Sequence, residues 1–142
     1  MIVRGSAFGS GARTGLVRLA NAGHPAPVVL APGYAGAADE SGPALGAFDH
    51  AEFPAVEFTL RPGQSLVLHT DGLDAAVNAS RGLDPLAACA APPHHVADLL
   101  ALDHDRPLDA SLARFESRLD GLNGSLHAPD DVAVLAVRFN PA

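Results

Sequence analysis

The feature that most constrains this chain is a short apolar run that ends at a carboxylate. Residues 65–69 follow the turn signal Arg-Pro-Gly-Gln at 61–64, and Asp71 and Gly72 come shortly after them. An aliphatic run of this length between turn signals predicts a buried β-strand. A rigid sheet can hold Asp71 there as a ligand for a hard cation, and Gly72 allows a sharp turn or the close approach of a ligand. Taken alone, an Asp-Gly pair is more typical of a turn or a helix N-cap.

A second acidic stretch precedes another strand near the other end of the chain. Asp130 and Asp131 come directly before the β-type run at 132–139. If this strand lies beside the strand at 65–69, the carboxylates meet at one edge of the sheet. Adjacent carboxylates repel one another unless a cation or a proton neutralises them. The sequence therefore predicts a divalent-cation site that includes Asp71 and the pair Asp130 and Asp131.

Length and composition exclude several classes of protein. The 142 residues are enough for one domain, and the hydrophobic share of 48% argues against disorder. The net charge of −7 disfavours a nucleic-acid partner. A single cysteine, Cys89, excludes an internal disulfide or a cysteine-based zinc site. No apolar run approaches the length of a membrane span, and residues 1–6 lack the apolar core of a signal peptide, so we expect a cytoplasmic protein without a membrane partner.

The order of the predicted elements gives the fold class. Residues 1–13 have no periodicity and are expected to form a loose lead-in. Strands at 14–21 and 27–31 predict one hairpin, and strands at 52–60 and 65–69 predict a second, with Pro54 at an edge. We expect a Gly-rich loop at 32–43, a short edge segment at 44–48, helical segments at 74–78, 84–91, 96–100 and 109–122, and a returning strand at 131–139. This order is typical of an α+β fold with largely antiparallel pairing.

Histidines are the other candidates for chemistry. His24, in the turn Gly-His-Pro, could act as a general acid, but a ring that packs or hydrogen-bonds locally to hold the turn is the simpler interpretation. His69 is expected to be a packing residue, and His94 and His95 to lie at a solvated helix start. No serine stands in a nucleophile-elbow context, so a serine hydrolase is not supported.

Four segments occur in an order and spacing that match a known family. They are Leu-Ala-Asn-Ala-Gly-His-Pro at 19–25, Gly-Pro-Ala-Leu-Gly at 42–46, Leu-Arg-Pro-Gly-Gln-Ser-Leu-Val-Leu-His-Thr-Asp-Gly-Leu at 60–73, and Asp-Asp-Val-Ala-Val-Leu at 130–135. Together they resemble the SpoIIE-type branch of the metal-dependent protein phosphatases, in the superfamily of protein phosphatase type 2C. The resemblance runs from about residue 14 to residue 139.

The resemblance implies both a fold and an activity. It implies an antiparallel β-sandwich flanked by helices, and hydrolysis of phosphoserine and phosphothreonine with two Mn²⁺ or Mg²⁺ ions. Asp71 and Asp130 would be metal ligands and Asp131 would support them. The implied partner is a phosphorylated regulator of the anti-anti-sigma type.

The chain also departs from the family's pattern. Further metal ligands of the family lie in a Gly-Gly-Asp-x-x-Asp segment before the first hairpin, and this chain has no Gly-Asp pair. We therefore expect residues 14–140 to be a partial phosphatase domain whose N-terminal part is missing. The alternatives are a non-catalytic module that binds a regulator of sigma factors, or a defective fragment. Because covering strands would then be absent, we also expect marginal stability or an oligomer.

Overall fold

The computed structural model describes residues 2–6, 15–38, 42–83, 93–100, 106–123 and 131–140. It is a mixed α+β structure in which every described strand pair is antiparallel, as expected from the sequence. The strands are β1 (Ile2–Ser6), β2 (Gly15–Ala20), β3 (Val28–Ala31), β4 (Tyr34–Ala37), β5 (Ala55–Leu60), β6 (Ser65–His69) and β7 (Val134–Arg138). The helices are α1 (Asp71–Ser80), α2 (Pro93–Leu100) and α3 (Leu108–Asn123).

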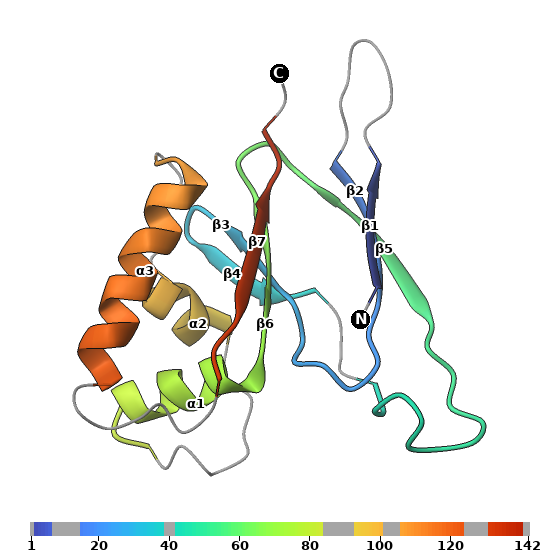
Figure 1. Ribbon diagram of the computed structural model, residues 1–142. Coiled ribbons are helices and arrows are strands. Elements are labelled where there is room, and N and C mark those ends of the chain that lie inside the picture. Colours follow the sequence, from blue (N-terminus) through green and yellow to red (C-terminus); the bar gives the residue numbers. More distant parts are fainter. Residues whose placement is uncertain are drawn as a thin grey trace.

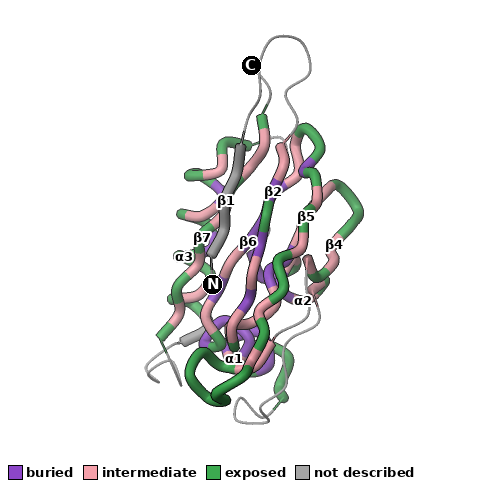
Figure 2. The backbone as a smooth tube through the Cα atoms, turned by 90° about the vertical axis from the view of Figure 1, so that its right-hand side faces the viewer, coloured by how far each residue is buried: buried purple, intermediate pink, exposed green. Residues whose placement is uncertain are grey.

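Two sheets face each other, and the three helices pack on one of them (Figure 1). Sheet A has the strand order β1-β2-β5, and sheet B has the order β4-β3-β6-β7. The helices lie on the face of sheet B that points away from sheet A (Figure 1). Figure 2 shows sheet A in front of sheet B, with buried residues in α1 and between the sheets and exposed residues in the loops. No helix in the described ranges is long and apolar enough to cross a membrane.

The two predicted hairpins are wrong, because the strands of each belong to different sheets. β2 pairs with β1 and β5, whereas β3 pairs with β4 and β6. The turn at 61–64, with Gly63 at φ 80, therefore joins the sheets across the sandwich. Leu60 and Leu66, on either side of this turn, are both buried in the cluster between the sheets. Apolar alternation had identified the strands but carried no information about which strand lies beside which.

Three further predictions are corrected. Residues 2–6 of the expected lead-in form β1, which pairs with β2. The expected loop at 32–43 contains β4, which forms a tight hairpin with β3. The segment at 44–48 is a turn with exposed Leu45 and Phe48, not an edge strand. For β1 and β4 the local composition was misleading because backbone hydrogen bonds to a neighbouring strand need no particular side chains.

Other predictions are confirmed. β5 begins directly after Pro54 and lies at an edge of sheet A. The predicted helices at 96–100 and 109–122 are α2 and α3, whereas the helix expected at 84–91 lies outside the described residues. The returning strand β7 pairs with β6, with His69 opposite Val134. This pairing is the one on which the predicted cation site depends.

The core has a large part and a small part. The large part fills the space between sheet B and the helices, where Val67 of β6 packs with Leu73 of α1 and Leu100 of α2. The small part lies between the sheets, and its fully buried members are Val17, Leu60 and Leu66. β6 contributes to both parts, so the strand that leads to Asp71 is the best-packed strand described.

Candidate metal centre

Asp71 is the first residue of helix α1, directly after strand β6 ends at His69. Thr70 is the N-cap and has an extended conformation, with φ −80 and ψ 161. The side chain of Asp71 is exposed. A carboxylate in the first turn of a helix interacts favourably with the positive end of the helix dipole. Asp71 thus follows a strand, as expected, but it is the first residue of the helix and not its N-cap, which is Thr70.

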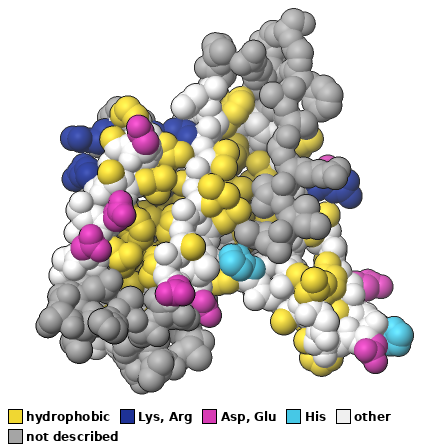
Figure 3. Space-filling view, in the orientation of Figure 1, with side chains coloured by type: hydrophobic (Ala, Val, Ile, Leu, Met, Phe, Trp, Pro, Cys, Tyr) yellow, Lys and Arg dark blue, Asp and Glu magenta, His cyan; other side chains and the backbone are white. Residues whose placement is uncertain are grey.

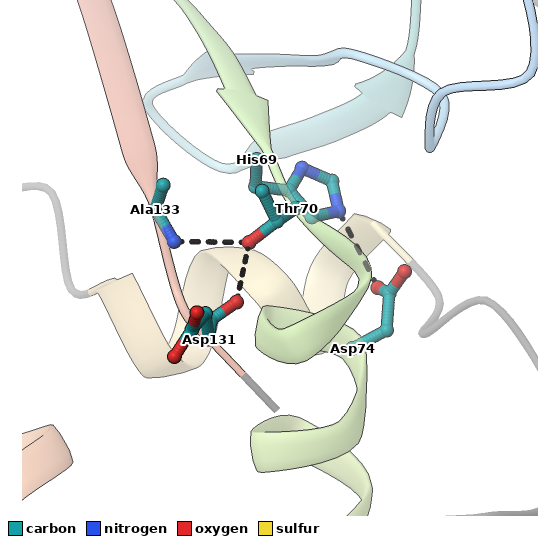
Figure 4. A network of polar contacts seen from close by, with 5 residues as sticks. All are labelled: His69, Thr70, Asp74, Asp131 and Ala133. Atoms are coloured by element: carbon teal, nitrogen blue, oxygen red, sulfur yellow. Dashed lines mark hydrogen bonds and ion pairs between the residues drawn. The ribbon is translucent and has the colours of Figure 1, made fainter. Parts of the chain in front are cut away.

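Thr70 joins the end of β6 to the start of β7 (Figure 4). Its hydroxyl donates a hydrogen bond to the carbonyl oxygen of Asp131 at 2.9 Å and accepts one from the backbone N–H of Ala133 at 2.9 Å. The backbone N–H of Thr70 also donates to the carbonyl oxygen of Ala133 at 3.1 Å. We call this set of three hydrogen bonds the Thr70 clamp. It places the residue after Thr70 and the residues before Ala133 at the same edge of sheet B.

The Thr70 clamp brings two of the three predicted ligands to one place. Asp71 follows Thr70 directly, and Asp131 is itself a partner of the clamp with an exposed side chain (Figure 4). Asp130 lies outside the described residues. Carboxylate oxygens are the ligands that Mg²⁺ and Mn²⁺ prefer, so Asp71 and Asp131 suit such ions. Within the described ranges, however, no three Asp, Glu, His or Cys side chains converge on a possible metal position.

A buried pair lies behind Asp71. His69 and Asp74 are 4% and 7% exposed, and His69 Nε2 lies 3.4 Å from Asp74 Oδ1 (Figure 4). Asp74 is one helical turn after Asp71, so the pair ties the end of β6 to the first turn of α1. His69 was expected to be a packing residue, and it is buried, but its contact with a carboxylate was not foreseen. The available sequence signal for this contact was that Asp74 follows His69 by five residues, across the end of a strand.

His24 lies at the same edge of the sandwich. It lines a cavity of about 250 Å³ together with His69, Thr70 and Ala133. The turn that carries it is closed by the buried side chain of Asn21, whose Oδ1 accepts from the His24 N–H at 3.1 Å and whose Nδ2 donates to the His24 carbonyl at 2.9 Å. Asn21 therefore holds the turn through the backbone of His24, a role that the sequence interpretation had given to the histidine ring.

Two of the sequence segments that resemble the phosphatase family pack against each other beside this turn. A Cβ atom on Gly23, which has φ 75, would lie 2.5 Å from Ala44 Cα. A Cβ atom on Gly42 would lie 2.9 Å from the carbonyl oxygen of Asn21. Side chains larger than hydrogen do not fit at these positions, so the small residues at 42–46 and Gly23 permit the close contact.

Comparisons with known proteins identify the family and the fold. The family model described as "Stage II sporulation protein E (SpoIIE)" matches residues 11–140. A search of curated proteins finds no match.

Solved structures give the same result at the level of the fold. The PP2C domain of SiaA from Pseudomonas aeruginosa superposes with a TM-score of 0.68 at 22% identity, over 88% of this chain and 47% of that one. The PP2C phosphatase domain of SpoIIE from Bacillus subtilis, with a fragment of its regulatory domain, gives 0.64 at 13% identity, over 89% and 35%. The RsbU and RsbW domains of Rv1364c from Mycobacterium tuberculosis give 0.52 at 25% identity, over 89% and 33%. This chain thus spans about half or less of the length of each.

Proposed function

This chain belongs to the stage II sporulation protein E (SpoIIE) family, and on that premise we propose that it forms part of a metal-dependent serine/threonine phosphatase domain. The proposed reaction is hydrolysis of a phosphomonoester on a regulatory phosphoprotein. The observation that carries the proposal is the Thr70 clamp, because it joins the two carboxylate-bearing segments at one edge of a rigid sheet. The sequence resemblance further suggests a partner of the anti-anti-sigma type. The hydropathy of the sequence is the basis on which we propose a cytoplasmic location.

The described residues fit part of a divalent-ion centre. Asp71 and Asp131 would hold Mn²⁺ or Mg²⁺ from adjacent ends of β6 and β7, with Asp130 as a further ligand from the sequence resemblance. Two such ions, when bound, supply an activated water and neutralise charge on phosphoryl oxygens. Further ligands are needed to complete a two-ion site, because the described residues offer no third converging donor.

The chain's own residues would orient the ligands in three ways. The Thr70 clamp fixes the spacing between the backbones of Asp71 and Asp131. Asp71 occupies the first position of α1, at the positive end of the helix dipole. The contact between His69 and Asp74 fixes the first turn of α1 against β6. Ligands held in this way need little reorganisation when an ion binds, which strengthens binding.

A second candidate function is a non-catalytic module that binds the regulatory protein without hydrolysing it. The lack of a third converging ligand within the described ranges favours this alternative for the chain as it stands. The two functions differ in turnover, and both allow a divalent ion to bind at Asp71.

The test measures hydrolysis and metal binding separately. Hydrolysis of p-nitrophenyl phosphate by the purified chain is followed with and without Mn²⁺, and Mn²⁺ binding is followed by electron paramagnetic resonance. We expect Asp71→Asn to weaken Mn²⁺ binding by about tenfold or more, because a charged ligand is lost. Asp120→Asn, an exposed carboxylate on α3, is the control and should change neither measurement.

The outcomes separate the two candidates. Mn²⁺-dependent turnover that is lost in Asp71→Asn supports the phosphatase and excludes the binding module. Mn²⁺ binding that depends on Asp71 without any turnover supports the binding module for this chain. Mn²⁺ binding that is the same in Asp71→Asn and in the parent protein would overturn the proposed metal centre.

A further inference from the structure

A second cavity lies among the three helices, away from the candidate metal centre. Its volume is about 400 Å³, and residues from all three helices line it. The ten residues of α1 separate Asp71, at one end of the helix, from Arg81, which is the C-cap at the other end. At 1.5 Å per residue this separation is about 15 Å, so the two sites are distinct. The lining residues are Val77, Ser80, Arg81, His95, Asp98, Leu99 and Arg118.

Among the described residues that line this cavity, positive charge exceeds negative charge. Arg81 and Arg118 line it, and the carboxylate of Asp98 is the single acidic side chain among its described lining residues. Arg118 Nη1 donates to the backbone carbonyl of Asp98 at 3.1 Å, which fixes one guanidinium against α2. The side chain of Arg81 has no hydrogen bond or ion pair within the described part of the chain. An excess of cationic groups is unusual in a protein whose net charge is −7.

His95 supplies a second observation about this cavity. Its Nδ1 atom is buried and has no hydrogen-bond partner among the described residues. Burial lowers the pKa of His95 below 6.5, and the positive charges of Arg81 and His94 lower it further, while Asp98 opposes them. A buried polar atom without a partner is costly, and it is usually satisfied by a ligand or a water molecule. Capping of α1 could account for Arg81 alone, but it does not account for this nitrogen.

We propose that the cavity bounded by Arg81, His95 and Arg118 binds an oxyanion of the phosphate class. Guanidinium groups match the geometry of phosphate oxygens and bind them through charge-assisted hydrogen bonds. His95 also lies in the first turn of α2, near the positive end of the helix dipole. Such an anion could be free orthophosphate or the phosphoryl group of a phosphorylated side chain. The proposal does not depend on the phosphatase activity or on the metal centre.

The test follows the ring of His95 by nuclear magnetic resonance while phosphate is added to the metal-free chain. Chloride at matched ionic strength is the reference, and the His95→Gln variant assigns the ring signals. We expect a saturable shift of the His95 signals and a rise in the pKa of His95, because a nearby anion favours the charged ring. A titration with a phosphoserine peptide then distinguishes the two sources. Tighter binding of the peptide than of orthophosphate indicates a phosphorylated protein, and weaker binding indicates the free anion.

Variants make the test specific to the cavity. Arg81→Gln should weaken phosphate binding by about tenfold, because a charge-assisted hydrogen bond is lost. Arg114→Gln is the matched control, since Arg114 is exposed on α3 and does not line the cavity. Asp71→Asn should bind phosphate as the parent protein does. The proposal is overturned if the His95 signals do not saturate with millimolar phosphate, if the two arginine variants lose binding equally, or if Asp71→Asn abolishes it.

Discussion

Thr70 is the residue on which the geometry of the candidate metal centre depends most. One hydroxyl serves two backbone groups of the strand that begins beside it, at 2.9 Å in each case. A threonine next to an Asp-Gly pair suggests an N-cap from sequence. Its side chain instead bonds to residues 61 and 63 positions away along the chain and makes no capping hydrogen bond to α1.

Two substitutions of Thr70 should distinguish the contribution of the clamp's hydrogen bonds to stability from the contribution of side-chain packing. Thr70→Val keeps the shape of the side chain but leaves the Ala133 N–H and the Asp131 carbonyl without their partner, which should lower the free energy of unfolding by about 1–2 kcal/mol. Thr70→Ser keeps the hydroxyl and should stay within about 0.5 kcal/mol of the parent protein. Chemical denaturation measures both. Equal stability of the two variants would show that the clamp contributes nothing.

At the scale of elements, strand β7 has an edge at which no described strand pairs with it. It is the last strand of sheet B. On either side of β7, the backbone groups of Ala133 and Phe139 form hydrogen bonds with the segment that contains β6. Because the direction of the backbone groups alternates along a strand, those of the odd-numbered residues of β7 point toward β6. The backbone groups of Val134, Ala136 and Arg138 therefore point away from the sheet.

The side chains of β7 do not block this edge either. Leu135 and Val137 are 58% and 51% exposed. Figure 3 shows hydrophobic side chains on both sides of the strand at the centre of this face, between α3 and sheet A. By contrast, α2 packs against β4, and Pro54 and the exposed Glu57 protect β5.

We predict that the isolated chain self-associates through β7. In a dimer with a two-fold axis at Ala136, the two β7 strands would pair in antiparallel orientation, with Leu135 opposite Val137 of the partner. The backbone groups of each β7 that point away from its own sheet would form the hydrogen bonds between the two copies. Val137→Lys places a charge on this edge and should shift the protein toward monomer. Thr59→Lys, an exposed position on β5, is the matched control. Sedimentation velocity over a range of concentrations measures the effect, and a parent protein that remains monomeric throughout would contradict the prediction.

At the scale of the whole molecule, stability is unevenly distributed between the sheets. Ten buried residues form the core between sheet B and the helices, whereas three form the core between the sheets. Within the described residues, sheet A contributes Val17 and Leu60 to the small core and buries Leu19 as well, while β6 of sheet B contributes to both cores. Regions with few buried apolar contacts open more readily than the best-packed elements.

The rate of amide hydrogen exchange should therefore differ between the two sheets. We expect amides of β2 and β5 to exchange faster than amides of β3 and β6, because sheet A can separate from sheet B without disturbing the larger core. Mass spectrometry of peptic fragments measures the exchange of both sets of amides, those of sheet A and those of sheet B, in one experiment. Leu66→Ala, which weakens the small core, should widen the difference. Uniform protection across the four strands would mean that the two cores open as one unit.

The sequence by itself determined the strands β2, β3, β5, β6 and β7, the helices α2 and α3, the α+β class and the family, but it missed β1 and β4. These follow from local patterns, such as the period of the apolar residues, the turn signals and the motifs at 60–73 and 130–135. It also placed Asp71 after β6 and the pair Asp130 and Asp131 before β7, and the structure confirms that the strands β6 and β7 are neighbours. Their role as ligands stays a prediction.

Only the tertiary structure decided which strands are neighbours and which side chains meet. The expected hairpins were wrong because a turn such as 61–64 can join strands within a sheet or across a sandwich, and the local sequence is the same in both cases. The Thr70 clamp, the contact between His69 and Asp74, and the arginine-lined cavity all join residues from different elements. Backbone hydrogen bonding is common to every strand, so the packing of apolar faces in three dimensions selects the partners.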